Sequence, residues 1–143
     1  MRWAPVFPLE SLGVIDYLAA AMSDSPTLTL LPGTLELCIL RALRWEPTHG
    51  SGIGEWIRLV TDGAFDLEEG TLYPALHRLQ RRGLIESEWG VSDHGRRARF
   101  YHLTAAGRAR LPQLLSGWDR YVEAVNRVAR YGHPALWAQA PSS

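Results

Sequence analysis

The sequence contains no lysine, so all fifteen of its basic residues are arginine. It also has a single cysteine, Cys38, which excludes a disulfide within one chain and fits a reducing compartment such as the cytoplasm. Cys38 lies in the apolar run LELCILRAL, which indicates a small core residue rather than a reactive thiol. The apolar runs are shorter than the ~20 residues of a membrane-spanning helix, so no membrane partner is expected.

Patterns that carry catalysis or bind metal are missing as well. The five histidines are dispersed, without a pair at i, i+4 and without a cysteine or carboxylate at a metal-ligand spacing. There is no glycine-rich phosphate loop and no G-x-S-x-G turn. We therefore predict that the protein is not an enzyme, with no catalytic residue, no metal and no cofactor.

The sequence does contain enough apolar residues, 46% of 143, for one compact domain with an appendage. Its net charge of zero is unevenly distributed, because residues 70–110 hold eight arginines and three carboxylates. This segment carries a net charge of +5 and the remainder carries −5. Local positive charge of this size is compatible with a nucleic-acid partner, and a solvated arginine-rich face is the alternative.

Residues 1–29 differ in composition from the rest of the chain and are interpreted as an N-terminal extension with one short helix. A signal peptide is disfavoured because Glu10 and Asp16 interrupt the apolar stretch and only Arg2 precedes it. An alternative is that Met22 is the physiological start, in which case residues 1–21 are not part of the native protein.

Three helices are predicted between residues 30 and 83. The first begins at Pro32-Gly-Thr and ends at Glu46 before a proline. The second covers residues 51–60, with Ser51 as N-cap. The third opens at Glu68 and Glu69, contains Pro74 in or near its first turn and ends at Gly83. The inward residues are expected to be Leu35, Ile39, Ala42, Leu43, Ile53, Trp56, Ile57, Val60, Leu72, Leu76 and Leu79.

After Gly83 the apolar pattern indicates strands. LIESEWG and ARFYHLT, joined by VSDHGRR, predict a β-hairpin with a basic tip. Thr104 is expected to cap a last helix, which Pro112 should kink or interrupt, and residues 132–143 form a flexible tail. The fold class is therefore mainly α with a small β-hairpin (α+β). The order is that of a winged helix-turn-helix, although other small α+β domains share it.

The outer face of the third helix carries side chains suited to DNA. In a helix-turn-helix, the N-terminal part of this helix approaches base edges in the major groove. Arg78 is long enough for a bidentate contact to guanine, and Tyr73 offers a hydroxyl for phosphate. At the hairpin tip, Arg96 and Arg97 suit a wing that reaches phosphates or the minor groove. Arg81 and Arg82 have an equally good structural interpretation at the helix C-terminus.

The last helix has an apolar stripe too wide for the surface of so small a domain. A second copy of the chain should cover it, which would place two recognition helices about 34–36 Å apart. The alternative is that the helix folds back on its own domain. The expected dimer interface consists of Leu111, Leu114, Leu115, Trp118, Tyr121, Val122 and Val125.

Four segments closely resemble the PadR family of bacterial transcriptional regulators: LPGTLELCILRAL, HGSGIGEWI, EEGTLYPALHRLQRRGLIESEWG and GRRARFYHLTAAGRARL. The resemblance covers residues 31 to about 111. It implies a winged helix-turn-helix (residues 30–104), a dimerisation helix (105–131), and operator binding as a homodimer, usually to repress. With the positions carried over, the expected DNA contacts are Gly70, Thr71, Tyr73, Pro74, His77, Arg78, Gly95, Arg96 and Arg97.

The resemblance also bears on two smaller features. Where the family has His-Gly-Tyr before the second helix, this chain has His49-Gly50-Ser51, so any contact of that tyrosine is in doubt. Trp118 and Tyr121 are expected to pack within the interface; the alternative, which the resemblance to relatives that bind aromatic compounds implies, is that they line an effector pocket between subunits. The competing function is a winged helix that binds another protein and not DNA.

Overall fold

The computed structural model describes residues 27–31 and 33–131. The expected C-terminal tail (residues 132–143) lies outside these residues. So do residues 1–26 of the expected N-terminal extension, which include Met22. The chain divides into two compact units, with the boundary between Leu111 and Pro112. The elements are α2 (Thr34–Ala42), β1 (Thr48–His49), α3 (Gly50–Val60), α4 (Glu69–Arg81), β2 (Ile85–Val91), β3 (Arg97–Leu103) and α5 (Ala105–Arg130).

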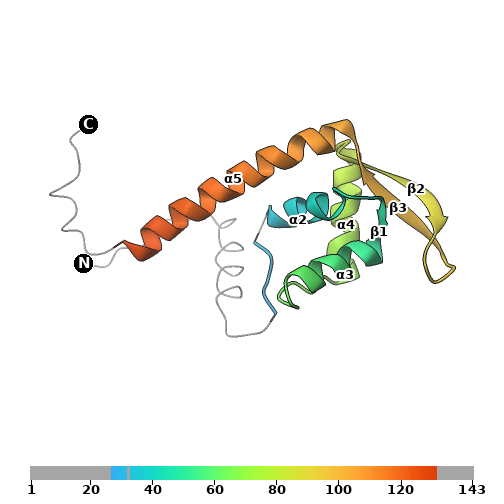
Figure 1. Ribbon diagram of the computed structural model, residues 1–143, viewed down its shortest axis with the longest axis horizontal. Helices are drawn as coiled ribbons and strands as arrows, with labels where there is room; N and C mark the ends of the chain where they lie inside the picture. The colour runs from blue at the N-terminus through green and yellow to red at the C-terminus, as the bar shows by residue number, and fades with distance from the viewer. Residues whose placement is uncertain (1–26, 32, 132–143) are drawn as a thin grey trace. The chain divides into compact units, whose positions relative to one another are not determined.

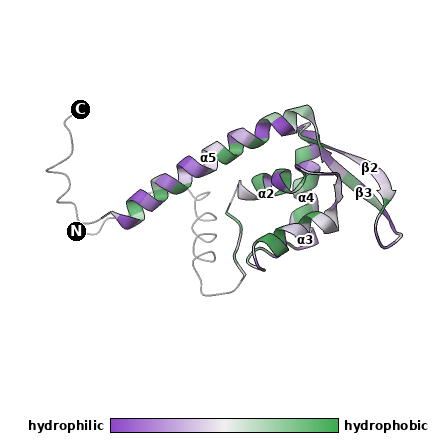
Figure 2. Cartoon of the chain, viewed as in Figure 1, coloured by the Kyte–Doolittle hydropathy of each residue, from purple (hydrophilic) through white to green (hydrophobic). Residues whose placement is uncertain are grey.

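Helices α2, α3 and α4 pack together beside the base of the β2–β3 hairpin, and the hairpin extends away from them (Figure 1). The apolar stripe predicted for α4 is confirmed, because Leu72, Leu76 and Leu79 are buried. The hydropathy colouring shows apolar residues along the packed faces of α2, α3 and α4 (Figure 2). The largest fully buried side chains are Ile39, Leu40, Leu43, Ile53, Ile57, Leu76 and Ile85.

Two details of the helical core differ from the prediction. Val60 was expected to face inward but is exposed, because α3 ends at this residue, whereas Trp56 is half-buried. Helix α2 ends at Ala42 rather than Glu46, since the chain must leave the helix to reach β1. Cys38 is half-buried in α2, and burial raises the pKa of its thiol, which agrees with a packing role.

Helix α4 begins and ends as expected. Glu68 is its N-cap, and Gly83 follows its C-cap with φ at 74°. The amide of Leu84 donates to the carbonyl of Leu79 (3.1 Å), and the amide of Gly83 donates to that of Gln80 (3.0 Å). These two bonds form a Schellman motif, which satisfies the last helical carbonyls. Pro74 lies in the second turn, five residues after Glu69.

Strand β1, formed by Thr48 and His49, was not predicted from the sequence. They pair antiparallel with Tyr101 and Phe100 of β3, so the sheet has three strands in the order β1-β3-β2. A two-residue strand is too short to show an alternating pattern. The N-cap of α3 was also assigned wrongly: the Nδ1 atom of His49, not Ser51, accepts a hydrogen bond from the amide of Gly52 (3.0 Å).

The predicted hairpin is confirmed. Strands β2 and β3 pair antiparallel in a register that sets Trp89 opposite Arg99 and Val91 opposite Arg97. In the connecting turn, the amide of Ser92 donates to the carbonyl of Arg96 (2.8 Å), and Gly95 adopts φ of 73°. Three helices, a small antiparallel sheet and a long C-terminal helix make the fold a winged helix-turn-helix, as predicted.

The start of α5 is anchored to the end of α4. The hydroxyl of Thr104 donates to the carbonyl of Gly83 (2.6 Å) and accepts from the amide of Gly107 (3.1 Å), as expected for a helix cap. Gly107 is buried directly against the carbonyl of Leu84, where a side chain has no room. The helix continues beyond Pro112, so this proline does not end it, and the alternative expectation of a kink stays a prediction. No described helix is both long enough and apolar enough to cross a bilayer.

Candidate nucleic-acid interface

The exposed face of α4 holds the residues that the sequence assigned to base contacts. Burial of the leucine stripe leaves the intervening side chains outside, as the helical period requires. The prediction that these side chains face outward is confirmed, whereas their contact with DNA stays a prediction. All nine expected DNA-contact residues are exposed: Gly70, Thr71, Tyr73, Pro74, His77, Arg78, Gly95, Arg96 and Arg97.

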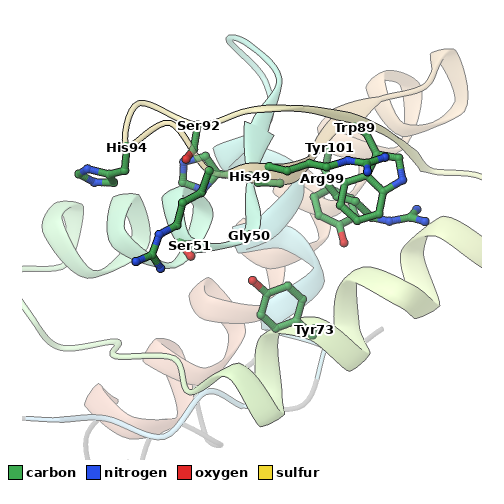
Figure 3. A pocket seen from close by; sticks show the side chains of 12 residues that line it. His49, Gly50, Ser51, Tyr73, Trp89, Ser92, His94, Arg99 and Tyr101 are labelled. Atoms are coloured by element: carbon green, nitrogen blue, oxygen red, sulfur yellow. The ribbon is translucent and has the colours of Figure 1, made fainter.

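A groove of about 860 Å³ lies between the start of α3, the N-terminal half of α4 and the hairpin (Figure 3). It brings Tyr73 of α4 together with Arg96 and Arg97 of the hairpin. Figure 3 shows His94 and Ser92 near the tip of the hairpin, and Tyr73 reaching up from α4. The lining residues are His49, Gly50, Ser51, Tyr73, Trp89, Ser92, His94, Arg96, Arg97, Ala98, Arg99 and Tyr101.

The other predicted contacts do not line this groove. Gly70, Thr71, Pro74, His77 and Arg78 lie along α4, outside the set of groove residues. Gly95 shapes the hairpin turn through its positive φ. The candidate interface therefore has two parts, the exposed face of α4 and the groove beside it, and Tyr73 belongs to both.

Tyr73 is held by close packing on the start of α3. A Cβ atom on Gly50 would come within 2.8 Å of the phenol ring, so only glycine allows the ring to lie there. Ser51, which replaces the family's tyrosine, is exposed at the groove and not part of the core. The missing ring therefore leaves no hole in the core, and a small hydroxyl stands at the groove instead.

The register of the hairpin separates its charges onto opposite faces. Because side chains alternate along a strand, Trp89, Arg97 and Arg99 share one face, and Glu86 and Glu88 share the other. The face with the arginines lines the groove, and none of the twelve lining residues is a carboxylate. The positive charge that the sequence located in residues 70–110 is thus concentrated on the groove side.

Tyr101 lies on the same face of the hairpin and is buried. Burial raises the pKa of its hydroxyl, and the nearby charge of Arg99 opposes this only in part. The phenol therefore stays neutral at physiological pH, and it adds no negative charge to the groove.

The arginines differ in whether they form an ion pair with a carboxylate. Arg82 pairs with Glu36 of α2 at 3.0 Å, which favours the structural interpretation of this residue. Within residues 27–31 and 33–131, Arg78, Arg96 and Arg97 form no ion pair with a carboxylate. Their guanidinium groups thus remain available for phosphate or a base edge.

Sequence reasoning missed Trp89 and Arg99 as groove residues, together with His49, Ser51 and His94. The alternation in IESEWGV and RARFYHL indicates that each strand has two faces, but only the pairing shows that Trp89 and Arg99 lie opposite each other. In the part of the chain that the structure describes, no group of three or more His, Cys, Asp or Glu side chains could hold a metal ion.

The residues assigned to a dimer interface are not equivalent. Leu111 is only 4% exposed and belongs to the core of its own unit, so we remove it from the expected interface. Leu114, Leu115 and Val122 are half-buried, whereas Trp118, Tyr121 and Val125 are exposed. The rings of Trp118 and Tyr121 stack, with their centroids 6.3 Å apart and an interplanar angle of 23°.

The helices, the hairpin wing and the cationic groove define a winged helix-turn-helix protein. Residues 39–113, more than half of the chain, match the family described as the transcriptional regulator PadR-like family. The chain belongs to this family, which confirms the resemblance seen in the sequence.

Known relatives agree with this assignment. The transcriptional regulator Rv3488 of Mycobacterium tuberculosis is 44% identical over 61 residues, which cover 42% of this chain and 56% of the relative. A PadR-like transcriptional regulator from Bacillus cereus is 29% identical with a TM-score of 0.61, over 70% of this chain and 95% of that one. Bacillus subtilis PadR in complex with operator DNA has the same fold, at 23% identity and a TM-score of 0.53, over 58% and 46% of the two chains.

Proposed function

We propose that this member of the family is a sequence-specific regulator that binds double-stranded DNA. It acts in the cytoplasm as a homodimer on an inverted-repeat operator, and its usual effect is repression. The observation that carries this proposal is the groove between α4 and the wing, which is lined by arginine and histidine side chains and by no carboxylate. A surface of this kind attracts the phosphates of a duplex.

Each part of the interface has its own role. The exposed face of α4 lies in the major groove, where Arg78, in the last turn of the helix, can contact guanine through O6 and N7. The wing places Arg96 and Arg97 on the phosphates or minor groove beside it. DNA binding is also supported by Bacillus subtilis PadR, which has the same fold and is in complex with operator DNA.

The homodimer is proposed from the exposed stripe of α5. Trp118, Tyr121 and Val125 expose large apolar surfaces that a second copy of the helix would cover. A two-fold axis through this helix would present two α4 helices to successive major-groove faces of one operator. A small aromatic effector that inserts beside Trp118 and Tyr121 would then release the DNA.

A salt titration tests DNA binding. The affinity of the purified protein for a duplex from its own promoter should fall steeply with salt, because each neutralised phosphate contributes about −0.9 to the slope of log K against log salt. The double variant Arg96→Ala/Arg97→Ala should bind all duplexes more weakly. Its slope of log K against log salt should be shallower by about 2, because each arginine contributes about 1. Arg120→Ala with Arg130→Ala removes the same charge from α5 and serves as the control.

The outcome separates the competing functions. Equal affinity of wild type and the Arg96/Arg97 variant would reject the wing assignment. If the folded dimer binds no promoter fragment at low salt and without effector, DNA binding is rejected. The alternative function, a winged helix that binds another protein, would then remain. Arg78→Ala should instead relax the preference among duplex sequences, by about 1–3 kcal/mol at one base pair, with little change in the slope.

A further inference from the structure

Trp89 lies in the groove with two arginines over its ring. The guanidinium carbon of Arg97 is 4.5 Å from the ring centroid, and that of Arg99 is 4.9 Å from it. Both distances are within the range of a cation–π interaction. Trp89 is 57% exposed, so it adds little to the hydrophobic core.

The cluster of Trp89, Arg97 and Arg99 is connected to α4 by hydrogen bonds. Arg99 donates a hydrogen bond from Nη1 to the hydroxyl of Ser87 (2.9 Å), and this hydroxyl lies 3.4 Å from the side-chain oxygen of Gln80 in α4. Arg97, in contrast, has no hydrogen bond to a carboxylate or hydroxyl among the described residues. Arg99 thus anchors the cluster, and Arg97 keeps its donors free.

A guanidinium that stacks on an aromatic ring keeps its N–H donors in its own plane, where they can form a bidentate contact with phosphate. Stacking also restricts the rotamers of a long side chain before DNA arrives, so less conformational entropy is lost on binding. Two guanidinium groups within 5 Å of the same ring centroid repel each other, and attraction to the electron-rich ring offsets this repulsion.

We propose that Trp89 is a positioning residue of the DNA-binding wing, which holds Arg97 and Arg99 in the groove with their donors directed to phosphate. This inference rests on the proposed function, and it adds Trp89 and Arg99 to a site that the sequence assigned to Arg96 and Arg97 alone. Trp89 acts through the two arginines and does not itself contact the duplex.

The chain contains a matched control. Trp45 is exposed and carries Arg41 and Arg44, each with its guanidinium carbon 5.3 Å from the ring centroid. None of these three residues lines the groove. Trp45→Leu therefore removes an equivalent stack at a place where the proposal assigns no role in DNA binding.

The test compares Trp89→Leu, Trp89→Phe and Trp45→Leu for binding to a promoter duplex that the wild type binds. Trp89→Leu should weaken binding about tenfold, from the loss of two cation–π contacts, and Trp89→Phe should restore part of it. The slope of log K against log salt should stay at the wild-type value, because the arginines still neutralise the same phosphates. Trp45→Leu should bind as the wild type does.

A double-mutant cycle completes the test. In a background with Arg97→Ala and Arg99→Ala, Trp89→Leu should have no further effect, because the groups that it positions are gone. An unchanged tenfold loss in that background would show direct contact of Trp89 with DNA and would overturn the proposal. Wild-type affinity of Trp89→Leu would overturn it as well and leave the proposed function intact.

Folding and the proposed function are controlled separately. Circular dichroism and thermal unfolding establish that each variant is folded at the assay temperature. Trp89→Met replaces Trp89→Leu if the latter unfolds, since it keeps bulk without an aromatic ring. Failure of the wild type to bind any promoter duplex would reject the proposed function itself, a result distinct from failure of the Trp89 variants alone.

Discussion

Helices α4 and α5 share an amphipathic pattern but have different surroundings in the structure. Each is amphipathic and contains a proline, Pro74 in α4 and Pro112 in α5. The apolar stripe of α4 is buried within its own chain, whereas most of the α5 stripe beyond Leu111 is half-buried or exposed. An apolar stripe therefore indicates that a helix must be covered, but not whether its own domain or a second copy of the chain covers it.

The largest expected difference between the two helices concerns stability. Leu76 is fully buried in α4, so Leu76→Ala should lower the free energy of unfolding by about 2–5 kcal/mol, through lost transfer energy and a cavity. Val128 in α5 is 85% exposed, and Val128→Ala should change the free energy of unfolding by less than about 0.5 kcal/mol. Urea unfolding measures both, and equal losses would remove the contrast between the helices.

The next difference concerns assembly. Trp118→Asp places a carboxylate in the proposed α5 interface and should weaken the dimer by about 2 kcal/mol or more, which yields monomers at micromolar concentration. Sedimentation velocity measures this. Ser116→Asp adds the same charge two residues away, on the other side of the helix, and should leave the dimer intact. An intact Trp118→Asp dimer would reject the interface.

The smallest expected difference lies within α5 and sharpens the comparison. Gly107 packs against the carbonyl of Leu84, so Gly107→Ala should destabilise the protein by about 1–3 kcal/mol through overpacking. Gly117 has no atom near the position of an added Cβ, so Gly117→Ala should stabilise the helix by up to about 1 kcal/mol. Thermal unfolding measures both, and shifts of the same sign would contradict the different surroundings of the two glycines.

Much of the fold could be predicted because its signals are local. The leucine spacing of α4, Gly83 after its end, the cap at Thr104 and the two alternating segments each act over a few residues. Strand β1 and the burial of Leu111 could not be predicted, because each depends on a partner distant in sequence or on the packing of another element. The His49 cap is local, since Gly52 is three residues away, but histidine is not among the preferred N-cap residues, so Ser51 was the stronger candidate.

The candidate site shows the same division. That Thr71, Tyr73, Arg78 and the Arg96–Arg97 pair face outward followed from helical period and loop composition. The groove that joins Tyr73 to the wing, and the role of Trp89 within it, required the pairing of β2 with β3. A shift of one residue in that register would exchange the arginine face for the glutamate face.

By itself, the sequence determined the family, the order of the helices and the hairpin, and the segment that holds the excess of arginine, because spacing and composition act locally. Only the tertiary structure decided which hairpin face those arginines occupy. It also decided that the apolar stripe of α4 is buried within its own domain, whereas most of the α5 stripe is not. These outcomes depend on strand register and on packing between distant segments, and no local pattern specifies either.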